Sequence, residues 1–184
     1  GDFIAQAKAS NYVADYPFLS EAANDSLEGF LFPKTYDFAG QTVTADSIIR
    51  AMLSQYQAEI ATLDLDTARQ TLQSRYGTSF TNYDILTMAS IIEKEALTDD
   101  DRTLISSVFY NRIASSMPLQ SDATLAYTLG REVTADDLTQ DDPYNTYTNM
   151  GLTPTPICNP GLASLTAAAN PQDTGYYYFY ITSS

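Results

Sequence analysis

The chain has 184 residues, of which 44% are hydrophobic and 17% charged, so it can build one sizeable core and is not intrinsically disordered. Its 23 acidic residues outnumber its 9 basic ones, and this net charge of −14, with no basic stripe, excludes nucleic acid and anionic membrane surfaces as favourable partners. The absence of histidine excludes a Ser-His-Asp triad, a Cys-His pair and a His-based zinc site. Acid–base chemistry therefore has to come from carboxylates, tyrosines or lysines.

Cys158 is the single cysteine, so the chain forms no internal disulfide and has no cysteine cluster for a metal. We expect no metal site and no cofactor. No apolar run approaches the roughly 18 residues of a membrane span, and residues 1–13 have neither the basic nor the apolar region of a signal peptide.

Helical periodicity and capping residues predict a mostly helical α+β domain. The expected helices cover residues 44–61, 64–76, 82–97, 102–116, 123–129, 135–138 and 162–169. Two segments rich in proline, glycine or aromatic residues, 28–42 and 147–161, are expected to be loops. The aromatic run 176–182 predicts a strand that pairs with FLFPKTY (30–36), which would form a small aromatic-rich β element.

Two glutamates lie within the apolar arc of the segment 82–97 when it is drawn as a helix. Glu93 and Glu95 fall on either side of Ile85, whereas Lys94, Ser90 and Thr87 take the opposite face. Burial disfavours an ionised carboxylate, so one of the two glutamates is expected to have a raised pKa and to suit general acid catalysis. The alternative is that one glutamate pairs with an arginine such as Arg102 or Arg112 and the other reaches water; periodicity does not choose between them.

An ordered set of motifs over residues 28–180 resembles the MltG (YceG-like) family of endolytic murein transglycosylases. These motifs are EGFLFPKTY (28–36), MASIIEKEA (88–96), SSVFYNRI (106–113), MPLQSDATLAY (117–127), PYNTYTNMGLTPTPICNPG (143–161) and SLTAAANP (164–171). The resemblance implies a lysozyme-like catalytic core in which one glutamate cleaves the β-1,4 bond between MurNAc and GlcNAc of nascent peptidoglycan. The product would carry a 1,6-anhydroMurNAc end.

The resemblance also implies which glutamate is the catalyst. In lysozyme-like transglycosylases the catalytic glutamate ends a core helix before a small residue, and Glu95-Ala96 occupies the corresponding place. Glu95 is therefore expected to act first as general acid and then as base, with Glu93 as a neighbour that tunes or orients it.

The family pattern assigns Gln120 and Asp122 to the wall of the substrate cleft. Asp122 is also the obvious second carboxylate if the enzyme were a hydrolase. The alternative is that Ser121 or Asp122 caps the helix that follows.

The motif YNTY (144–147) resembles the Tyr-Asn pair that faces the catalytic glutamate in other lytic transglycosylases. We expect Tyr144 to hold the proton of the glutamate, Asn145 to reach the acetamido group of the substrate and Tyr147 to line the groove. The alternative for Tyr147 is packing against the proline-rich loop.

As a family member, the chain 1–184 is expected to consist of an N-terminal helical and extended part (1–80) and a catalytic core (81–184). Compared with the family pattern, this sequence shows no membrane helix, no complete LysM-like module, and neither the histidine-containing tail nor the final helix. The resemblance thus implies a single-pass membrane protein with its catalytic part outside the cytoplasmic membrane. Peptidoglycan strands are the expected substrate, and cell-wall synthases are the expected partners.

Two other functions are consistent with some features of the sequence. Family members have carried the label aminodeoxychorismate lyase, an activity that would require pyridoxal phosphate on a lysine. Only Lys8, Lys34 and Lys94 are available, without a glycine-rich phosphate loop. The other alternative is a non-catalytic glycan-binding or scaffold module of cell-wall synthesis.

Overall fold

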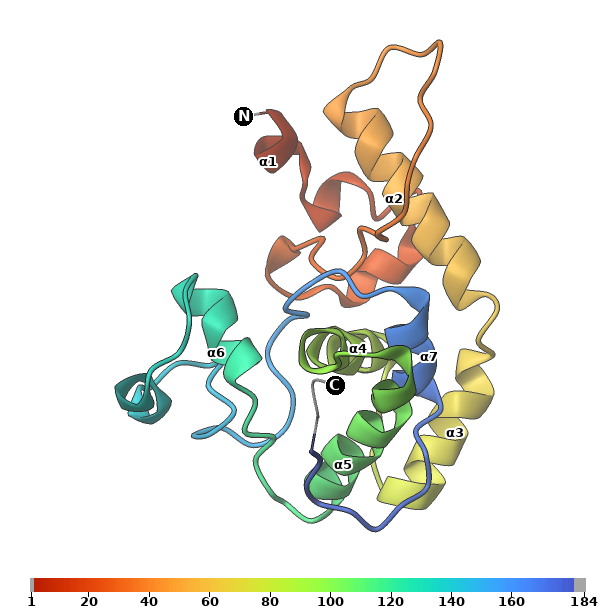
Figure 1. Cartoon of the computed structure of the whole chain (residues 1–184). Helices are drawn as coiled ribbons and strands as arrows, with labels where there is room; N and C mark the ends of the chain where they lie inside the picture. The colour runs from red at the N-terminus through yellow and green to blue at the C-terminus, as the bar shows by residue number, and fades with distance from the viewer. Residues whose placement is uncertain (1, 181–184) are drawn as a thin grey trace.

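The computed structural model of the chain describes residues 2–180 and contains seven α-helices within them (Figure 1). The helices are α1 (Asp2–Gln6), α2 (Ala45–Ile60), α3 (Leu65–Tyr76), α4 (Asn82–Glu95), α5 (Arg102–Ala114), α6 (Asp122–Leu129) and α7 (Leu162–Ala169). Short 3-10 turns join them, one of which, Ala135–Thr139, replaces the helix expected at 135–138. The mostly helical prediction is confirmed. The helix expected at 82–97 ends at Glu95, and no sequence signal had predicted α1.

Helix α4 passes through the middle of the molecule, with α5 and α7 packed against it (Figure 1). It begins at a capping box in which the Thr81 hydroxyl accepts a hydrogen bond from the Asp84 N–H at 3.1 Å and the Asp84 carboxylate accepts one from the Thr81 N–H at 2.9 Å. Every residue from Ile85 to Ile92 is buried. α4 is therefore held from all sides, which fixes the direction of the side chains in its last turn.

The face of α4 opposite Ile85 is covered by the loop that precedes α7. The Ser90 hydroxyl accepts a hydrogen bond from the Ile157 N–H at 3.0 Å, and the Cys158 thiol lies 3.2 Å from the Ser90 carbonyl oxygen, which accepts its hydrogen bond. Burial raises the pKa of Cys158 to about 12, so it remains a thiol. Lys94 on the same face is exposed.

The N-terminal part and the α4 bundle share one hydrophobic core. An aromatic cluster joins them, in which Phe30 stacks on Tyr83 of α4 with ring centroids 5.7 Å apart and packs edge-on against Tyr56 of α2 at 5.3 Å. On the other side of the molecule, α6 and the turn that follows it project away from the bundle (Figure 1). The described residues of the two expected parts, 2–80 and 81–180, thus contribute to one core around α4.

The expected β element is wrong for the part of the chain that the structure describes. Among residues 2–180 the only β pairing is an isolated bridge between Lys8 and Ser26, and residues 181 and 182 of the expected strand lie outside the described range. The backbone of the C-terminal segment bonds to side chains of α5 instead. Asn111 Nδ2 donates to the carbonyls of Thr174 and Tyr176, each at 2.8 Å, and Arg112 Nε donates to that of Tyr177 at 2.8 Å.

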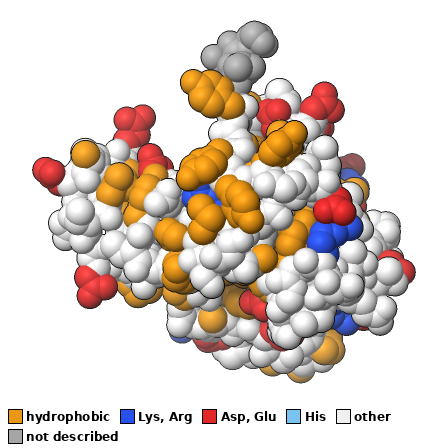
Figure 2. Space-filling model, turned by 90° about the horizontal axis from the view of Figure 1, so that it is seen from below, with side chains coloured by type: hydrophobic (Ala, Val, Ile, Leu, Met, Phe, Trp, Pro, Cys, Tyr) orange, Lys and Arg blue, Asp and Glu red, His pale blue; other side chains and the backbone are white. Residues whose placement is uncertain are grey.

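The C-terminal segment carries much of the exposed aromatic surface. Figure 2 shows hydrophobic side chains gathered on the face from which the last described residues emerge. The exposed tyrosines of this segment are Tyr176, Tyr177, Tyr178 and Tyr180, whereas Phe179 packs edge-on against Phe109 with ring centroids 5.7 Å apart. No helix within residues 2–180 combines the length and the hydropathy needed to cross a membrane.

Candidate active site

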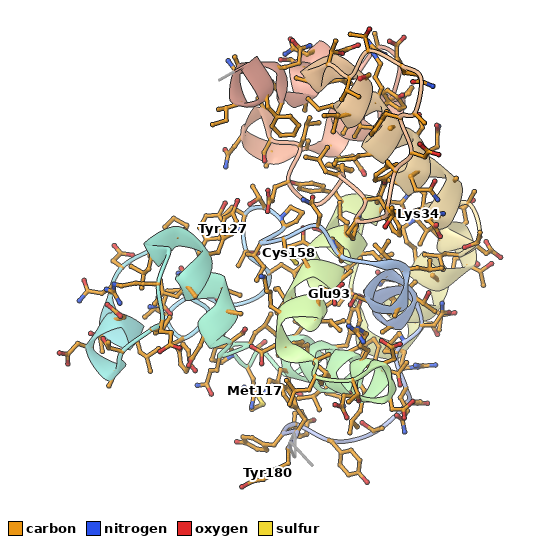
Figure 3. All side chains as sticks on the ribbon, turned by 45° about the horizontal axis from the view of Figure 1, so that its top comes forward. Lys34, Glu93, Met117, Tyr127, Cys158 and Tyr180 are labelled. Atoms are coloured by element: carbon orange, nitrogen blue, oxygen red, sulfur yellow. The ribbon has the colours of Figure 1, made fainter. Side chains whose placement is uncertain are left out.

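Glu95 is the last residue of α4, and its side chain faces a cavity of about 150 Å³. The helix ends there because Ala96 adopts an extended conformation with φ −76° and ψ 136°. The cavity lies at the end of the molecule where Met117 and Tyr180 are labelled in Figure 3. Its lining residues are Glu95, Phe109, Arg112, Leu119, Gln120, Tyr178 and Phe179.

The surroundings of Glu95 favour its protonated form. Burial raises the pKa of Glu95, the hydrogen bond from Ser121 lowers it, and the negative charge of Asp122 raises it, so the pKa is raised overall. A carboxyl group at the edge of a cavity with a raised pKa has the property that a general acid needs.

Ser121 is the direct hydrogen-bond partner of Glu95, whereas its sequence position had indicated only a capping role. Its hydroxyl donates to Glu95 Oε1 and makes no capping bond to α6, although Ser121 occupies the N-cap position. The buried hydroxyl of Thr146 fixes Ser121, because it accepts from the Ser121 N–H at 2.9 Å and lies 3.0 Å from the Thr124 hydroxyl. The only sequence signal for this role was the position of Ser121 beside Asp122 in a family motif.

Glu93 lies on another side of α4 and is part of an ion pair. Figure 3 shows Glu93 on α4 beside α7. Arg102 Nη2 donates to Glu93 Oε2 at 2.8 Å, and the Gly161 N–H donates to Oε1 at 2.9 Å. Burial raises the pKa of Glu93, but the hydrogen bonds from Arg102 and Gly161 outweigh it, and the pKa is lowered overall. Glu93 therefore matches the alternative expectation of a glutamate paired with Arg102.

Of the residues expected at the cleft, Gln120 lines the cavity of Glu95, whereas Asp122 and Tyr147 lie near Glu95 but are not among the lining residues. Gln120 lines the cavity and is held in the left-handed region at φ +56°, where its N–H donates to the Thr146 carbonyl at 3.1 Å. The Tyr147 hydroxyl donates to the Asp122 carboxylate. Burial, Asp122 and Glu95 together raise the pKa of the Tyr147 hydroxyl group.

Tyr144 and Asn145 are not brought to the cavity. The Tyr144 hydroxyl lies 2.7 Å from the Thr155 hydroxyl, and its ring packs against Tyr127 with centroids 5.3 Å apart. Asn145 is fully buried, and its Nδ2 donates to two backbone carbonyls, those of Leu138 at 3.0 Å and Gln140 at 2.9 Å. Its Oδ1 accepts from the Tyr147 N–H at 2.9 Å, so Asn145 shapes the turn that carries Tyr147.

Arg112 of α5 is a further polar residue of the cavity, which the sequence reasoning considered only as a partner for a glutamate. It is buried, and its guanidinium lies 4.9 Å from the centre of the Tyr178 ring. Among residues 2–180 no group of three or more Cys, Asp or Glu side chains has the geometry of a metal site. The cavity thus combines one carboxyl group, one guanidinium and aromatic walls.

The model of the YceG-like family matches residues 2–184 of the chain. The chain belongs to the YceG-like family. Two curated relatives are named endolytic murein transglycosylase: that of Bacillus subtilis (strain 168) is 42% identical over 161 residues, and that of Streptococcus pneumoniae serotype 2 (strain D39) is 36% identical over 192 aligned positions. These alignments cover 86% and 96% of this YceG-like chain but 42% and 32% of the two relatives.

A solved structure has the same fold. The crystal structure of a putative yceG-like protein from Listeria monocytogenes superposes with a TM-score of 0.80 at 37% sequence identity, covering 99% of this chain and 61% of that one. The resemblance predicted from the motifs is therefore confirmed at the level of family and fold. The YceG-like chain described here spans less than half the length of the two curated relatives.

Proposed function

We propose that this chain is the catalytic part of an endolytic murein transglycosylase with a lysozyme-like core. It cleaves the β-1,4 bond between MurNAc and GlcNAc of nascent glycan strands and leaves 1,6-anhydroMurNAc ends. Family membership and the names of the two relatives support the reaction class. The observation that carries the proposal is the half-buried carboxyl group of Glu95, at the end of a core helix, with its pKa raised by burial.

In this proposal Glu95 transfers one proton in each direction. Because Ser121 donates to Oε1, the proton of the neutral carboxyl group sits on Oε2 and passes to the glycosidic oxygen as its bond to the anomeric carbon breaks. The N-acetyl group of the MurNAc residue stabilises the positive charge that develops at its anomeric carbon. The C6 hydroxyl oxygen of the MurNAc residue then attacks the anomeric carbon of the same residue. The ionised Glu95 takes the proton of this hydroxyl group, which restores the neutral acid.

The neighbouring residues have distinct roles in this scheme. Ser121 positions Glu95, and the charge of Asp122 keeps the pKa of Glu95 raised. Gln120 and Tyr147 contact the sugar, whereas Glu93 is an ionised structural residue because Arg102 and Gly161 hold its carboxylate. Asn145 positions the turn before Tyr147, and Tyr144 supports the wall beyond the cavity.

The proposed cellular location of the protein follows from its proposed substrate and from its family. Since peptidoglycan lies outside the cytoplasmic membrane, we place this chain on that side, in a membrane-anchored protein that works with cell-wall synthases. The lyase alternative finds little support, because Lys94 and Lys8 are exposed and Lys34 lies 4.0 Å from the Glu59 carboxylate.

Digestion of defined uncrosslinked glycan strands followed by mass spectrometry tests the proposal. The unaltered chain should release anhydro-ended fragments, and Glu95→Gln should slow their release by about 10²–10⁴-fold, the contribution expected of a general acid. Glu132→Gln, which changes an exposed carboxylate, is the matched control and should keep full activity.

Three results would contradict the proposal. A product heavier by one water indicates hydrolysis instead of anhydro formation. Full activity in Glu95→Gln together with loss in Glu93→Gln would transfer the catalytic role to Glu93. Glycan binding without any product from the unaltered chain would support the non-catalytic module.

A further inference from the structure

Arg112 is a buried cation without a buried anion beside it. Only 7% of its surface is exposed, and none of the ion pairs within 4.0 Å among residues 2–180 includes Arg112. Its hydrogen bonds go to neutral oxygens: Nε donates to the Tyr177 carbonyl at 2.8 Å, and Nη1 donates to those of Pro118 at 3.1 Å and Leu119 at 3.3 Å. Nη1 also lies 3.5 Å from Gln120 Oε1.

This environment distinguishes Arg112 from the other basic residues of the described range. Six of them form ion pairs within 4.0 Å of a carboxylate: Lys34, Arg50, Arg69, Arg75, Arg102 and Arg131. Lys8 and Lys94 are exposed and hydrated. Burial of a charge is costly unless it is paired, so Arg112 is suited to an anion that residues 2–180 do not supply.

The guanidinium of Arg112 has room for such an anion on the cavity side. Nη2 has no hydrogen-bond partner among residues 2–180, while the Tyr178 ring covers one face of the group. Arg112 lines the same cavity as Glu95, whose volume of about 150 Å³ is small for a whole sugar ring and its substituents.

We propose that Arg112 binds a carboxylate carried by the glycan strand, next to the bond that Glu95 cleaves; this inference rests on the proposed function. The planar guanidinium suits a carboxylate, with which it forms directed, charge-assisted hydrogen bonds. A chain with a net charge of −14 repels an anionic strand at long range, so a dedicated cation at the cavity is needed to hold it in register. Arg112 is thus a specificity-determining residue for muramyl sugars over plain N-acetylglucosamine.

A muramyl sugar offers this carboxylate from two sources. When the stem peptide has been removed, the lactyl group ends in a free carboxylate. When the stem is present, the lactyl group is an amide and the carboxylates belong to the peptide. Binding of defined ligands separates the two sources.

The decisive experiment is calorimetric titration of the Glu95→Gln chain, which binds strands without cleaving them. Three ligands of equal length are compared: a neutral chitin oligosaccharide, a muramyl oligosaccharide with free lactyl carboxylates, and the same oligosaccharide with stem peptides. At least one carboxylate-bearing ligand should bind about tenfold more tightly than chitin, as expected for one charge-assisted contact, and the preference should shrink in high salt. Equal affinity for all three ligands overturns the inference.

Variants then locate the preference. Adding Arg112→Gln to Glu95→Gln should abolish the preference for carboxylate-bearing ligands over chitin. Arg112→Lys should retain part of the preference, because lysine keeps the charge but lacks the planar, two-donor geometry of the guanidinium. Adding Lys34→Gln, which removes one positive charge beside α2, should retain the full preference (Figure 3). Persistence of the preference in a folded Arg112→Gln chain, verified by circular dichroism, also overturns the inference.

The outcomes separate this inference from the proposed function. Release of anhydro ends by the unaltered chain, combined with equal affinity for all three ligands, refutes the role of Arg112 and leaves the transglycosylase intact. Absence of both binding and cleavage refutes both. Since the ligand comparison uses a chain with Arg112 in place, a failure of the Arg112 variants to fold does not affect it.

Discussion

Two glutamates only two residues apart in α4 have opposite electrostatic environments. Glu93 faces Arg102 and the Gly161 N–H, which lower its pKa overall, whereas Glu95 faces Ser121 and a cavity, and burial raises its pKa. Residues two apart on a helix point in nearly opposite directions, so α4 presents one carboxylate to its neighbours in the bundle and one carboxyl group to the cavity. Their division into a structural and a chemical role follows from this geometry.

Ser121→Ala tests the hydrogen bond to Glu95. Because that bond lowers the pKa of Glu95, its loss should raise this pKa and move the alkaline limb of the pH–rate profile to higher pH. The turnover rate should fall by about tenfold, since the carboxyl group loses a hydrogen bond of about 1.5 kcal/mol that orients it. Rates of anhydro product formation across pH measure both effects.

Asp122→Asn tests the opposite contribution. The charge of Asp122 raises the pKa of Glu95, so the neutral amide should lower this pKa and move the alkaline limb to lower pH. The amide oxygen of the new asparagine can still accept the hydrogen bond from the Tyr147 hydroxyl, so Tyr147 should keep its position. Shifts of the same direction in Asp122→Asn and Ser121→Ala would show that the limb does not report Glu95.

At this scale the sequence predicted the residue types but not their partners. The helical wheel placed both glutamates among apolar side chains, yet the contacts that distinguish them come from Ser121 and Arg102, 26 and 9 residues along the chain from their respective glutamates. Tyr144 and Asn145 were assigned by their motif alone. In the structure the Tyr144 hydroxyl lies beside that of Thr155, and the Asn145 amide donates to the backbone carbonyls of Leu138 and Gln140.

At the scale of elements, a polar clasp joins three helices at the end of the bundle. Arg102 of α5 donates from Nη2 to Glu93 of α4 and from Nε to the Ser164 hydroxyl of α7 at 2.9 Å. The side chain of Arg102 is only 14% exposed and that of Glu93 28%, so the pair is shielded from water. Without Glu93, Arg102 keeps only the exposed carboxylate of Asp99 as an ionic partner among residues 2–180, so its buried charge is less well compensated.

Glu93→Gln should therefore destabilise the fold by about 2 kcal/mol at neutral pH. Since the pKa of Glu93 is lowered in the folded state, its stabilising contribution is present above the ordinary glutamate pKa of about 4.3 and is lost as pH falls through the folded value. Urea unfolding at a series of pH values measures this, with Glu132→Gln as control. A difference from the unaltered chain that grows on acidification would contradict the clasp.

The helices were predictable because their signals are local. Periodicity, together with the capping-type residues at the start of α2, defined α2 and α4 to within two residues. The structure of the segment 176–182 was not predictable in this way, because a β-type composition does not show which groups will form hydrogen bonds with the backbone. In the described part, Asn111 and Arg112 of α5 take the carbonyls that a neighbouring strand would have used.

At the scale of the whole molecule, one close contact fastens the N-terminal part to the core. Gly29 has φ +97°, and a Cβ at this position would lie 2.6 Å from Pro156 Cγ and 3.0 Å from Leu86 Cδ2. Its N–H donates to Asn159 Oδ1 at 2.6 Å. The contact joins the 28–31 segment to the loop that also covers α4.

Gly29→Ala should destabilise the chain by about 3 kcal/mol, because it combines an unfavourable φ with overpacking. Gly77→Ala is the matched control, since Gly77 has φ +70° with open space around it and should cost only about 1 kcal/mol. Thermal and urea unfolding compare the two variants. Equal losses in both would mean that the close packing at Gly29 contributes nothing.

The mechanism depends on Glu95 being protonated. NMR titration of the glutamate side-chain carboxyl carbons measures the pKa of this group most directly. With ¹³C-labelled glutamate and resonances assigned by Glu95→Gln and Glu93→Gln, the account predicts that Glu95 titrates above the ordinary value of about 4.3 and Glu93 below it. A pKa of Glu95 at or below that ordinary value would contradict the account, because the side chain would then lack the proton that the first step transfers.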